Sequence, residues 1–379
     1  MDNSSVIGIL SFIIVILFFL LAAFLLTVKT SKKLSNQLLA TFLIITAIDI
    51  TAFFYHNFIT LPPSIEMFRI QISNFKDPLL FLYILSVIYS DFKLKAKHLF
   101  HLSLWLICII ILFPNFFLGN KEFQIDFLSK YHGNEVFESK IIGSITKIAE
   151  VIYIIAEIYY IARYRKLLLE NYTSKEAFYN YKWLKQLIIF ILLGQLLTFI
   201  KGFVRDTEDA DILFVNILRI ILLSFGIVFS FWLVLKALLS PKLFRGVDVN
   251  LKLSKEIAAT EKTINEIEGN EQTNTLKAYM AEEEPFLDPS LTVQSLAEKI
   301  ELPSRELSVL INQGLGLHFF DFVNGYRIEK AMSILKDPSK SKFTVLEILY
   351  EVGFNSKSSF NTAFKKYTGM TPTAFRKTQ

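Results

Sequence analysis

One stretch near the C-terminus, residues 357–368, combines side chains that suit contact with double-stranded DNA with side chains that bury a helix. At 100° per residue, Phe360, Phe364 and Tyr367 fall on one side of a helix over this stretch. The other side carries cations, hydroxyls and an amide: Lys357, Ser358, Asn361, Thr362 and Lys365, with Lys366 beside them. Asparagine can pair with adenine, while lysine and hydroxyl groups suit guanine or phosphate. We therefore expect one packed face and one face that contacts DNA.

The same arrangement occurs earlier in the chain. Its apolar positions are Leu307, Leu310 and Ile311. Its polar positions are Ser304, Arg305, Ser308 and Asn312. A short helical pattern precedes each copy, over residues 293–299 and 345–351, and Gly353 lies in the second turn. Two helix pairs joined by tight turns form an internal repeat, which predicts two helix-turn-helix units. The alternative is a small helical domain whose two amphipathic hairpins serve packing alone.

These residues resemble the DNA-binding domain of the AraC/XylS family of transcription regulators. The matching positions are Leu296-Ala297, Leu307-Ser308, Ile311-Asn312, Phe319 to Phe322, Tyr326-Arg327, Gly353-Phe354, Ser356 to Asn361, Phe364-Lys365 and Gly369 through Pro372 to Phe375-Arg376. The resemblance covers roughly the last quarter of the chain. It implies a longer helix over residues 319–335 that joins the units, so that their recognition helices enter successive major grooves about 34 Å apart. Leu349 and Pro303 depart from the pattern, where the family usually has a small residue and often has a capping Ser.

Charge is unevenly divided between the two units. Residues 344–379 hold five basic and two acidic side chains, a net charge of +3. Residues 276–343 hold eight basic and ten acidic side chains, a net charge of −2. Because phosphate contacts supply most of the general affinity for DNA, the second unit should bind the DNA backbone more strongly. The first unit is expected to add register and specificity.

The rest of the chain is unusually apolar. Of the 379 residues, 53% are hydrophobic and 37 are phenylalanines, which is typical of a membrane protein. A helix that spans a bilayer needs about 20 apolar residues, and we predict seven such segments in residues 1–240. They are Val6 to Val28, Leu38 to Phe58, Ile70 to Tyr89, Leu99 to Leu118, Ile141 to Ile161, Leu184 to Phe203 and Ile212 to Leu239. The third is the least regular, because Lys76, Asp77 and Pro78 interrupt it.

Lysine and arginine collect in alternate loops between these segments. The groups are Lys29 with Lys32 and Lys33, Lys93 with Lys95 and Lys97, Arg163 with Arg165 and Lys166, and Lys236 with Lys242 and Arg245. Short cytoplasmic loops carry the excess of positive charge, so the pattern places the N-terminus outside and everything after Leu239 in the cytoplasm. We therefore expect a multi-pass protein of the inner (cytoplasmic) membrane whose DNA-binding domain faces the DNA.

Four charged residues within the predicted spans are candidates for sensing a signal. They are Asp49, Glu150, Glu157 and Arg219. Charged side chains are costly in lipid and usually face the interior of a helical bundle. These residues could therefore line a pocket that responds to a small molecule or a membrane signal. The alternative is structural: Lys147 pairs with Glu150, and residues near the span ends reach the headgroups.

A change to polar composition after residue 240 marks a domain boundary. We divide the chain into a membrane sensor module, residues 1–240, a connector, residues 241–275, and a DNA-binding domain, residues 276–379. Apolar or small residues of the connector alternate spacings of four and three, as in a short coiled coil: Leu253, Ile257, Thr260, Ile264 and Ile267. Two interpretations stay open: a homodimer paired through this seam, with membrane tethering raising the local concentration, and a solvated linker helix.

The sequence does not predict catalysis, a metal site or a cofactor. It contains no HExxH, GxSxG, Walker lysine loop or glycine-rich dinucleotide motif. His98 and His101 can share a helix face, but no third ligand follows at a suitable spacing. Cys108 is the single cysteine, which excludes an intramolecular disulfide and a zinc cluster of thiolates. We therefore do not expect an enzyme.

The sequence thus predicts an all-α protein, in which a polytopic helical membrane bundle precedes a cytoplasmic domain of two helix-turn-helix units joined by a linker helix. The expected function is that of a membrane-bound one-component transcription regulator, which binds double-stranded DNA under the control of a signal sensed in the lipid bilayer. The alternative is a transporter or membrane enzyme that carries the DNA-binding domain for autoregulation. A coupled polar pathway or a catalytic motif within the spans would favour that alternative.

Overall fold

The computed structural model describes residues 3–28, 33–89, 91–173, 178–205, 212–239 and 266–378. In these ranges every regular element is helical, and Tyr172 and Thr292 form an isolated β-bridge. The expected all-α fold is therefore confirmed for the part of the chain that is described. Much of the connector, including Leu253, Ile257 and Ile264 of its predicted seam, lies outside the described residues.

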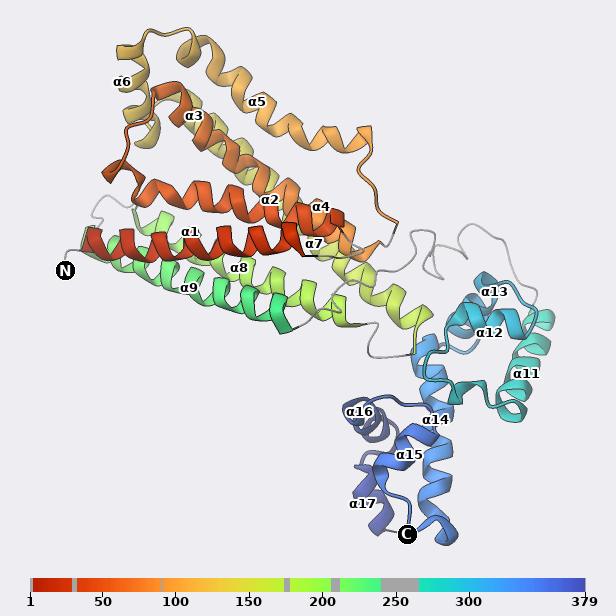
Figure 1. Ribbon diagram of the computed structural model, residues 1–379. Helices are drawn as coiled ribbons and strands as arrows, with labels where there is room; N and C mark the ends of the chain where they lie inside the picture. The colour runs from red at the N-terminus through yellow and green to blue at the C-terminus, as the bar shows by residue number, and fades with distance from the viewer. Residues whose placement is uncertain are drawn as a thin grey trace. The chain divides into compact units, whose positions relative to one another are not determined.

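The chain divides into two compact units, and the first comprises residues 1–161 with 182–246. Its helices, two of which extend beyond it, are α1 (Asn3–Thr27), α2 (Lys33–Ile50), α3 (Pro63–Ile72), α4 (Lys76–Ile88), α5 (Ser103–Leu112), α6 (Lys121–His132), α7 (Phe137–Asn171), α8 (Tyr179–Arg205) and α9 (Ile212–Leu239). Helix α1 packs against α2 and α9, and α2 packs against α4 (Figure 1). The C-terminal end of α7 and the first residues of α8 belong to the second unit.

Five helical segments among the described residues are long and apolar enough to cross a membrane. They are Val6–Thr27, Lys33–Phe53, Ala96–Phe117, Tyr179–Val204 and Ile212–Lys236. The expected seven spans are therefore not confirmed. The predicted third span is divided between α3 and α4 by a 3-10 turn, Ser73–Phe75, and α4 has only 13 residues. Helix α7 is long enough at 35 residues, but Lys147, Glu150 and Glu157 reduce its apolar character.

The second unit, residues 162–181 with 247–379, contains two helix-turn-helix pairs. The pairs are α12 (Val293–Lys299) with α13 (Ser304–Val309), and α15 (Val345–Glu351) with α16 (Lys357–Thr368). The remaining helices after residue 265 are α11 (Glu266–Glu282), α14 (Phe319–Lys336) and α17 (Pro372–Lys377). The first helix of each pair, α12 or α15, begins and ends at the residues that the sequence pattern predicted.

Local sequence fixes where most of these helices begin. The side-chain oxygens of Thr292, Thr344, Ser356 and Thr371 each accept a hydrogen bond from the backbone amide three residues on. Such a cap satisfies an amide that the helix leaves unpaired, and it contributes about 1 kcal/mol. Helix α13 is different, because its N-cap residue Pro303 offers no side-chain acceptor. This helix gives way after six residues to a π-helical turn, Leu310–Gly314.

Helix α14 contributes to two separate apolar cores. Phe319 and Phe322, in its first turns, pack with α11, α12 and α13. Ile328, Ala331 and Ile334, in its later turns, pack with α15, α16 and α17. Figure 1 shows α14 running from the first group of helices to the second. The expected joining helix is therefore present, and its length sets the separation of the two pairs.

A buried arginine lies at the middle of α14. Arg327 is 1% exposed, and its Nε and Nη2 donate to the carbonyl oxygens of Phe286 and Asp288 at 2.6 and 2.7 Å. Its guanidinium carbon lies 5.5 Å from the ring centroid of Phe354, in the turn before α16. Burial lowers the pKa of Arg327 to about 10, a shift that the charge of Asp288 opposes, so the side chain stays protonated at neutral pH. Arg327 thus connects the segment before α12 with the second pair.

Gly353 brings the turn of the second pair against the same segment. Its φ is +85°, a left-handed conformation that side chains with a Cβ disfavour. A Cβ atom at this position would lie 2.6 Å from the carbonyl oxygen of Phe286 and 2.7 Å from that of Leu287. The turn therefore requires glycine both for its backbone conformation and for the close approach of two chain segments.

Inside the second unit, residues at the end of α7 and just before α8 contact α14 and the start of the first helix-turn-helix pair. Next to the bridge between Tyr172 and Thr292, the hydroxyl of Thr173 donates to the carbonyl of Leu291 at 2.8 Å. The ring centroids of Phe178 and Phe320 are 5.7 Å apart. These contacts join the C-terminal end of α7 to the N-terminal end of α12, and the residue before α8 to the first turn of α14.

Replacing Gly353 with alanine should lower the free energy of unfolding by about 2–3 kcal/mol, because backbone strain and a steric clash add. Gly369→Ala is the matched control, since Gly369 has a φ of +78° but nothing lies within 4 Å of an added Cβ. That variant should lose only about 1 kcal/mol. Urea unfolding of residues 266–379, which contain both cores, measures the two losses. Equal losses would show that the close approach at Gly353 has no energetic effect.

Candidate nucleic-acid interface

Helix α16 presents the polar face that its sequence predicts. Phe360 and Phe364 are fully buried in the core of the second pair. The opposite face holds five of the expected DNA-contacting residues, of which Lys357, Ser358, Thr362 and Lys365 are exposed and Asn361 is half-buried. The hydroxyl of Thr362 donates to the carbonyl of Ser358 at 2.7 Å, which leaves its oxygen as an acceptor. This face can therefore offer cations, an amide and hydroxyls to a partner.

The end of α16 is attached to the start of α14. The Nζ of Lys366 lies 2.5 Å from Oδ1 of Asp321, and the hydroxyl of Tyr367 donates to the backbone carbonyl of the same residue. Lys366 remains 60% exposed, so this ion pair contributes little to stability by itself. The ion pair shows that Lys366, which the sequence pattern placed with the DNA-contacting residues, also holds α16 against α14. No periodic signal in the sequence points to Asp321.

The first recognition helix differs from its expected form. Ser304 is exposed and Arg305 is half-buried, as a contact with DNA requires. Ser308 is only 5% exposed, so we correct the expectation that it faces DNA. The amide Nδ2 of Asn312 donates to the carbonyl of Ser308 at 2.9 Å, and its Oδ1 lies 3.1 Å from Nδ1 of His318. Both functional atoms of Asn312 thus have partners within the protein.

The π-helical turn after α13 explains the difference at Asn312, whereas Ser308 lies before this turn, within α13. A rotation of 100° per residue holds only in a regular α-helix, and α13 ends at Val309. The wider turn over Leu310–Gly314 changes the directions of the side chains that follow. Asn312 therefore closes the turn instead of extending the exposed face. The exposed polar face of α13 is therefore shorter than that of α16.

Exposed lysines of the second half of the domain lie on α16 and α17. They include Lys357, Lys365 and Lys377, while the first half exposes Lys277 and Lys299 and pairs Lys330 with Glu284 at 2.5 Å. In the second pair the exposed acidic residue Glu351 lies 3.4 Å from Lys340. The net charge is +3 for residues 344–379 and −2 for residues 276–343, which favours the second half. Phosphate attraction should be strongest next to α16.

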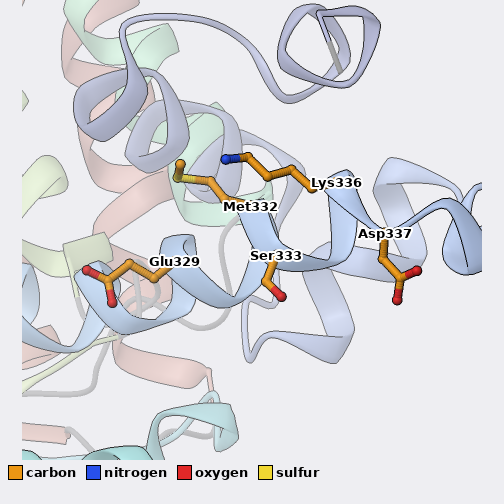
Figure 2. Close-up of a pocket in the computed structure, with 5 residues that line it drawn as sticks. All are labelled: Glu329, Met332, Ser333, Lys336 and Asp337. Carbon is orange, nitrogen blue, oxygen red and sulfur yellow. The ribbon is translucent and has the colours of Figure 1, made fainter.

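A shallow hollow runs along one face of α14 (Figure 2). It is lined by Glu329, Met332, Ser333, Lys336 and Asp337. In Figure 2, Met332 and Lys336 point toward the neighbouring helices, while Glu329, Ser333 and Asp337 point away from them. The Nζ of Lys336 lies 5.7 Å from the ring centroid of Phe375, so it covers the core of the second pair. The polar groups do not converge, and the hollow is a surface feature instead of a ligand site.

The four proposed sensor residues divide into two groups. Asp49 pairs with Lys76 at 2.8 Å, Glu150 is half-buried, and Glu157 is 3% exposed. Lys76 interacts electrostatically with both Asp49 and Glu150, so these positions lie in one region of α2, α4 and α7. Arg219 bonds instead to Asn216 on its own helix, at 3.1 Å. The expected pairing of Lys147 with Glu150 is not among the ion pairs of the described residues, and Lys147 is exposed.

Comparison with known proteins assigns a family to the C-terminal part. Residues 296–378 match a family model described as a helix-turn-helix domain. The chain is similar to the Msm operon regulatory protein of Streptococcus mutans, 28% identical over 111 residues, which cover 28% of this chain and 39% of that protein. It is also similar to the melibiose operon regulatory protein of Escherichia coli K12. The two are 31% identical over 90 residues, which cover 24% of this chain and 29% of that protein.

A further relative is the uncharacterized transcriptional regulatory protein YesN of Bacillus subtilis, 34% identical over 94 residues, 24% of this chain and 25% of that protein. The chain therefore spans well under half the length of each of these relatives. The residues that match the family model overlap the two helix pairs and α14, which joins them. An AraC-type helix-turn-helix domain thus occupies residues 296–378.

Proposed function

We propose that this protein is a membrane-bound one-component transcription regulator that reads a specific DNA sequence with both helix-turn-helix pairs. The observation that carries this proposal is α14, a single helix that packs into both cores and is bonded through Arg327 at its middle. A rigid spacer suits two recognition helices that enter successive major grooves, one helical turn or about 34 Å apart. Relatives named as operon regulators support the same function.

The proposed DNA contacts come from the polar faces of α13 and α16. They are Ser304, Arg305, Lys357, Ser358, Asn361, Thr362 and Lys365. The amide of Asn361 can pair with N6 and N7 of an adenine, and the guanidinium of Arg305 can pair with O6 and N7 of a guanine. Lys357 and Lys365 suit phosphates or guanine. Asn312 and Lys366 hold the two recognition helices in place and contribute to DNA binding through that role.

Residues 1–240 form the proposed sensor module, with the N-terminus outside and the DNA-binding domain in the cytoplasm. Five membrane-length helices support this location, and the lysine and arginine groups of alternate loops support the orientation. The hydrogen bond from Thr173 to Leu291 and the ring contact between Phe178 and Phe320 support coupling through the C-terminal end of α7 and the N-terminal end of α8. A signal that moves these ends would change the position of α12. Pairing of two chains through the connector would add a second reader to the same DNA site.

Lys365→Ala should weaken DNA binding to all sequences alike and reduce the slope of log affinity against log salt by about 1, because one phosphate contact is lost. Asn361→Ala should instead cost about 1–3 kcal/mol at one base position and leave the salt slope unchanged. Electrophoretic mobility shifts of residues 266–379 on sites selected from random DNA measure both. An exposed lysine outside the two pairs, Lys277 of α11, provides the control as Lys277→Ala. If Lys365→Ala changed neither the affinity nor its salt dependence, α16 would not supply the phosphate contact that we propose.

Cysteine labelling in intact cells distinguishes an arrangement with seven membrane spans from one with five. Seven spans place α6 outside, so Glu122→Cys should react with a membrane-impermeant maleimide, whereas five spans place α6 in the cytoplasm. Lys97→Cys should stay unlabelled until the cells are opened, and Lys377→Cys is the cytoplasmic control. The native Cys108 is fully buried and gives little background. Protection of Glu122→Cys together with labelling of Lys97→Cys would contradict the seven-span arrangement.

A further inference from the structure

Carboxyl and aromatic side chains alternate along the surface where α4 meets α7 in the first unit. The residues on α7 recur at spacings of three, four and three, which places them on one helix face: Glu150, Tyr153, Glu157 and Tyr160. On α4, Asp77 and Phe81 are one turn apart. The ring centroid of Phe81 lies 5.8 Å from that of Tyr153 and 5.7 Å from that of Tyr160. We call this surface the α4–α7 seam.

The seam contains a buried carboxyl that has no partner. Glu157 is 3% exposed, and its Oε1 makes no hydrogen bond although it is shielded from solvent. Asp77 interacts electrostatically with both Glu150 and Glu157, so three carboxyl groups share this region. The neighbouring cation, Lys76, is already paired with Asp49 at 2.8 Å. A buried carboxyl without a partner is costly in its charged form, and a positive charge supplied from outside the chain would stabilise that form.

The other side chains of the seam indicate what kind of cation fits. The ring of Phe81 lies 5.6 Å from that of His101, and Nδ1 of His101 lies 2.7 Å from the hydroxyl of Tyr153. Aromatic faces next to carboxylates attract ammonium groups that carry an apolar body. A metal ion would need several oxygen ligands at about 2.3–2.6 Å. Among the residues that the structure describes, no three His, Cys, Asp or Glu side chains are close enough to hold one.

We propose that the α4–α7 seam binds an organic ammonium ion, whose charge lies among Asp77, Glu150 and Glu157 and whose apolar body packs against Phe81 and Tyr160. Binding would draw α4 and α7 together, since each helix contributes both a carboxyl and an aromatic ring. As the site that receives the signal, the seam rests on the proposed regulatory function. As a binding site, it stands on its own contacts and can be tested without DNA.

The test measures thermal unfolding of the purified full-length protein in detergent with methylammonium, butylammonium and phenethylammonium chlorides. The midpoint temperature should rise with each ion, and affinity should increase with the size of the apolar body. Glu157→Gln and Asp77→Asn should each weaken the response to phenethylammonium at least tenfold. Both variants keep the side-chain shape, and replacing the unpartnered carboxyl of Glu157 or the half-buried carboxyl of Asp77 should not lower the basal midpoint.

Asp126→Asn is the matched control, because it makes the same carboxyl-to-amide change at an exposed ion pair with Lys130 on α6. It should respond to phenethylammonium as the native protein does. The proposal is overturned if none of the three ammonium ions shifts the midpoint, if Glu157→Gln responds like the native protein, or if sodium or calcium chloride at equal concentration produces the same shift. Because the assay contains no DNA, each of these results leaves the DNA-binding proposal untouched.

Discussion

The hydrogen bonds from the buried guanidinium of Arg327 to two backbone carbonyls hold the DNA-binding domain together as one body. The carbonyls of Phe286 and Asp288 belong to the segment before the first helix pair, while Phe354, over which the guanidinium lies, belongs to the second. Gly353 approaches the same segment so closely that a Cβ would not fit. A charge buried to this degree is costly unless its donors are satisfied, so the segment, α14 and the second pair must keep their arrangement. Two recognition helices at a set spacing follow from that requirement.

Sequence periodicity predicted the second pair better than the first for a physical reason. Helix α16 is regular over twelve residues and begins at a serine cap, so a rotation of 100° per residue describes its faces correctly. Helix α13 lacks a side-chain cap and buries Ser308, and it ends in a π-helical turn in which Asn312 bonds within the protein. The role of Arg327 was not predictable either, because its acceptors lie about forty residues earlier and such contacts leave no periodic signal.

In the first unit, apolar composition predicted helices but not how many cross the membrane. Two of the charges that make α7 ambiguous as a span, Glu150 and Glu157, belong to the α4–α7 seam with Asp77 and Phe81. Composition treats them as interruptions, whereas the helix packing places them together and leaves Glu157 without a partner. Polar residues within apolar helices are retained mostly where they serve binding or switching. In the α4–α7 seam, as in the core around Arg327, polar side chains lie where apolar ones would be expected, which is consistent with the binding roles that we propose.

The central claim is that α14 holds α13 and α16 in successive major grooves on one face of the DNA. Hydroxyl-radical footprinting of residues 266–379 on a selected site measures this directly. The account predicts two protected patches on the same face of the duplex, centred one helical turn or about 10 base pairs apart, with stronger protection beside α16. A single protected patch, or two patches separated by half a turn, would contradict it.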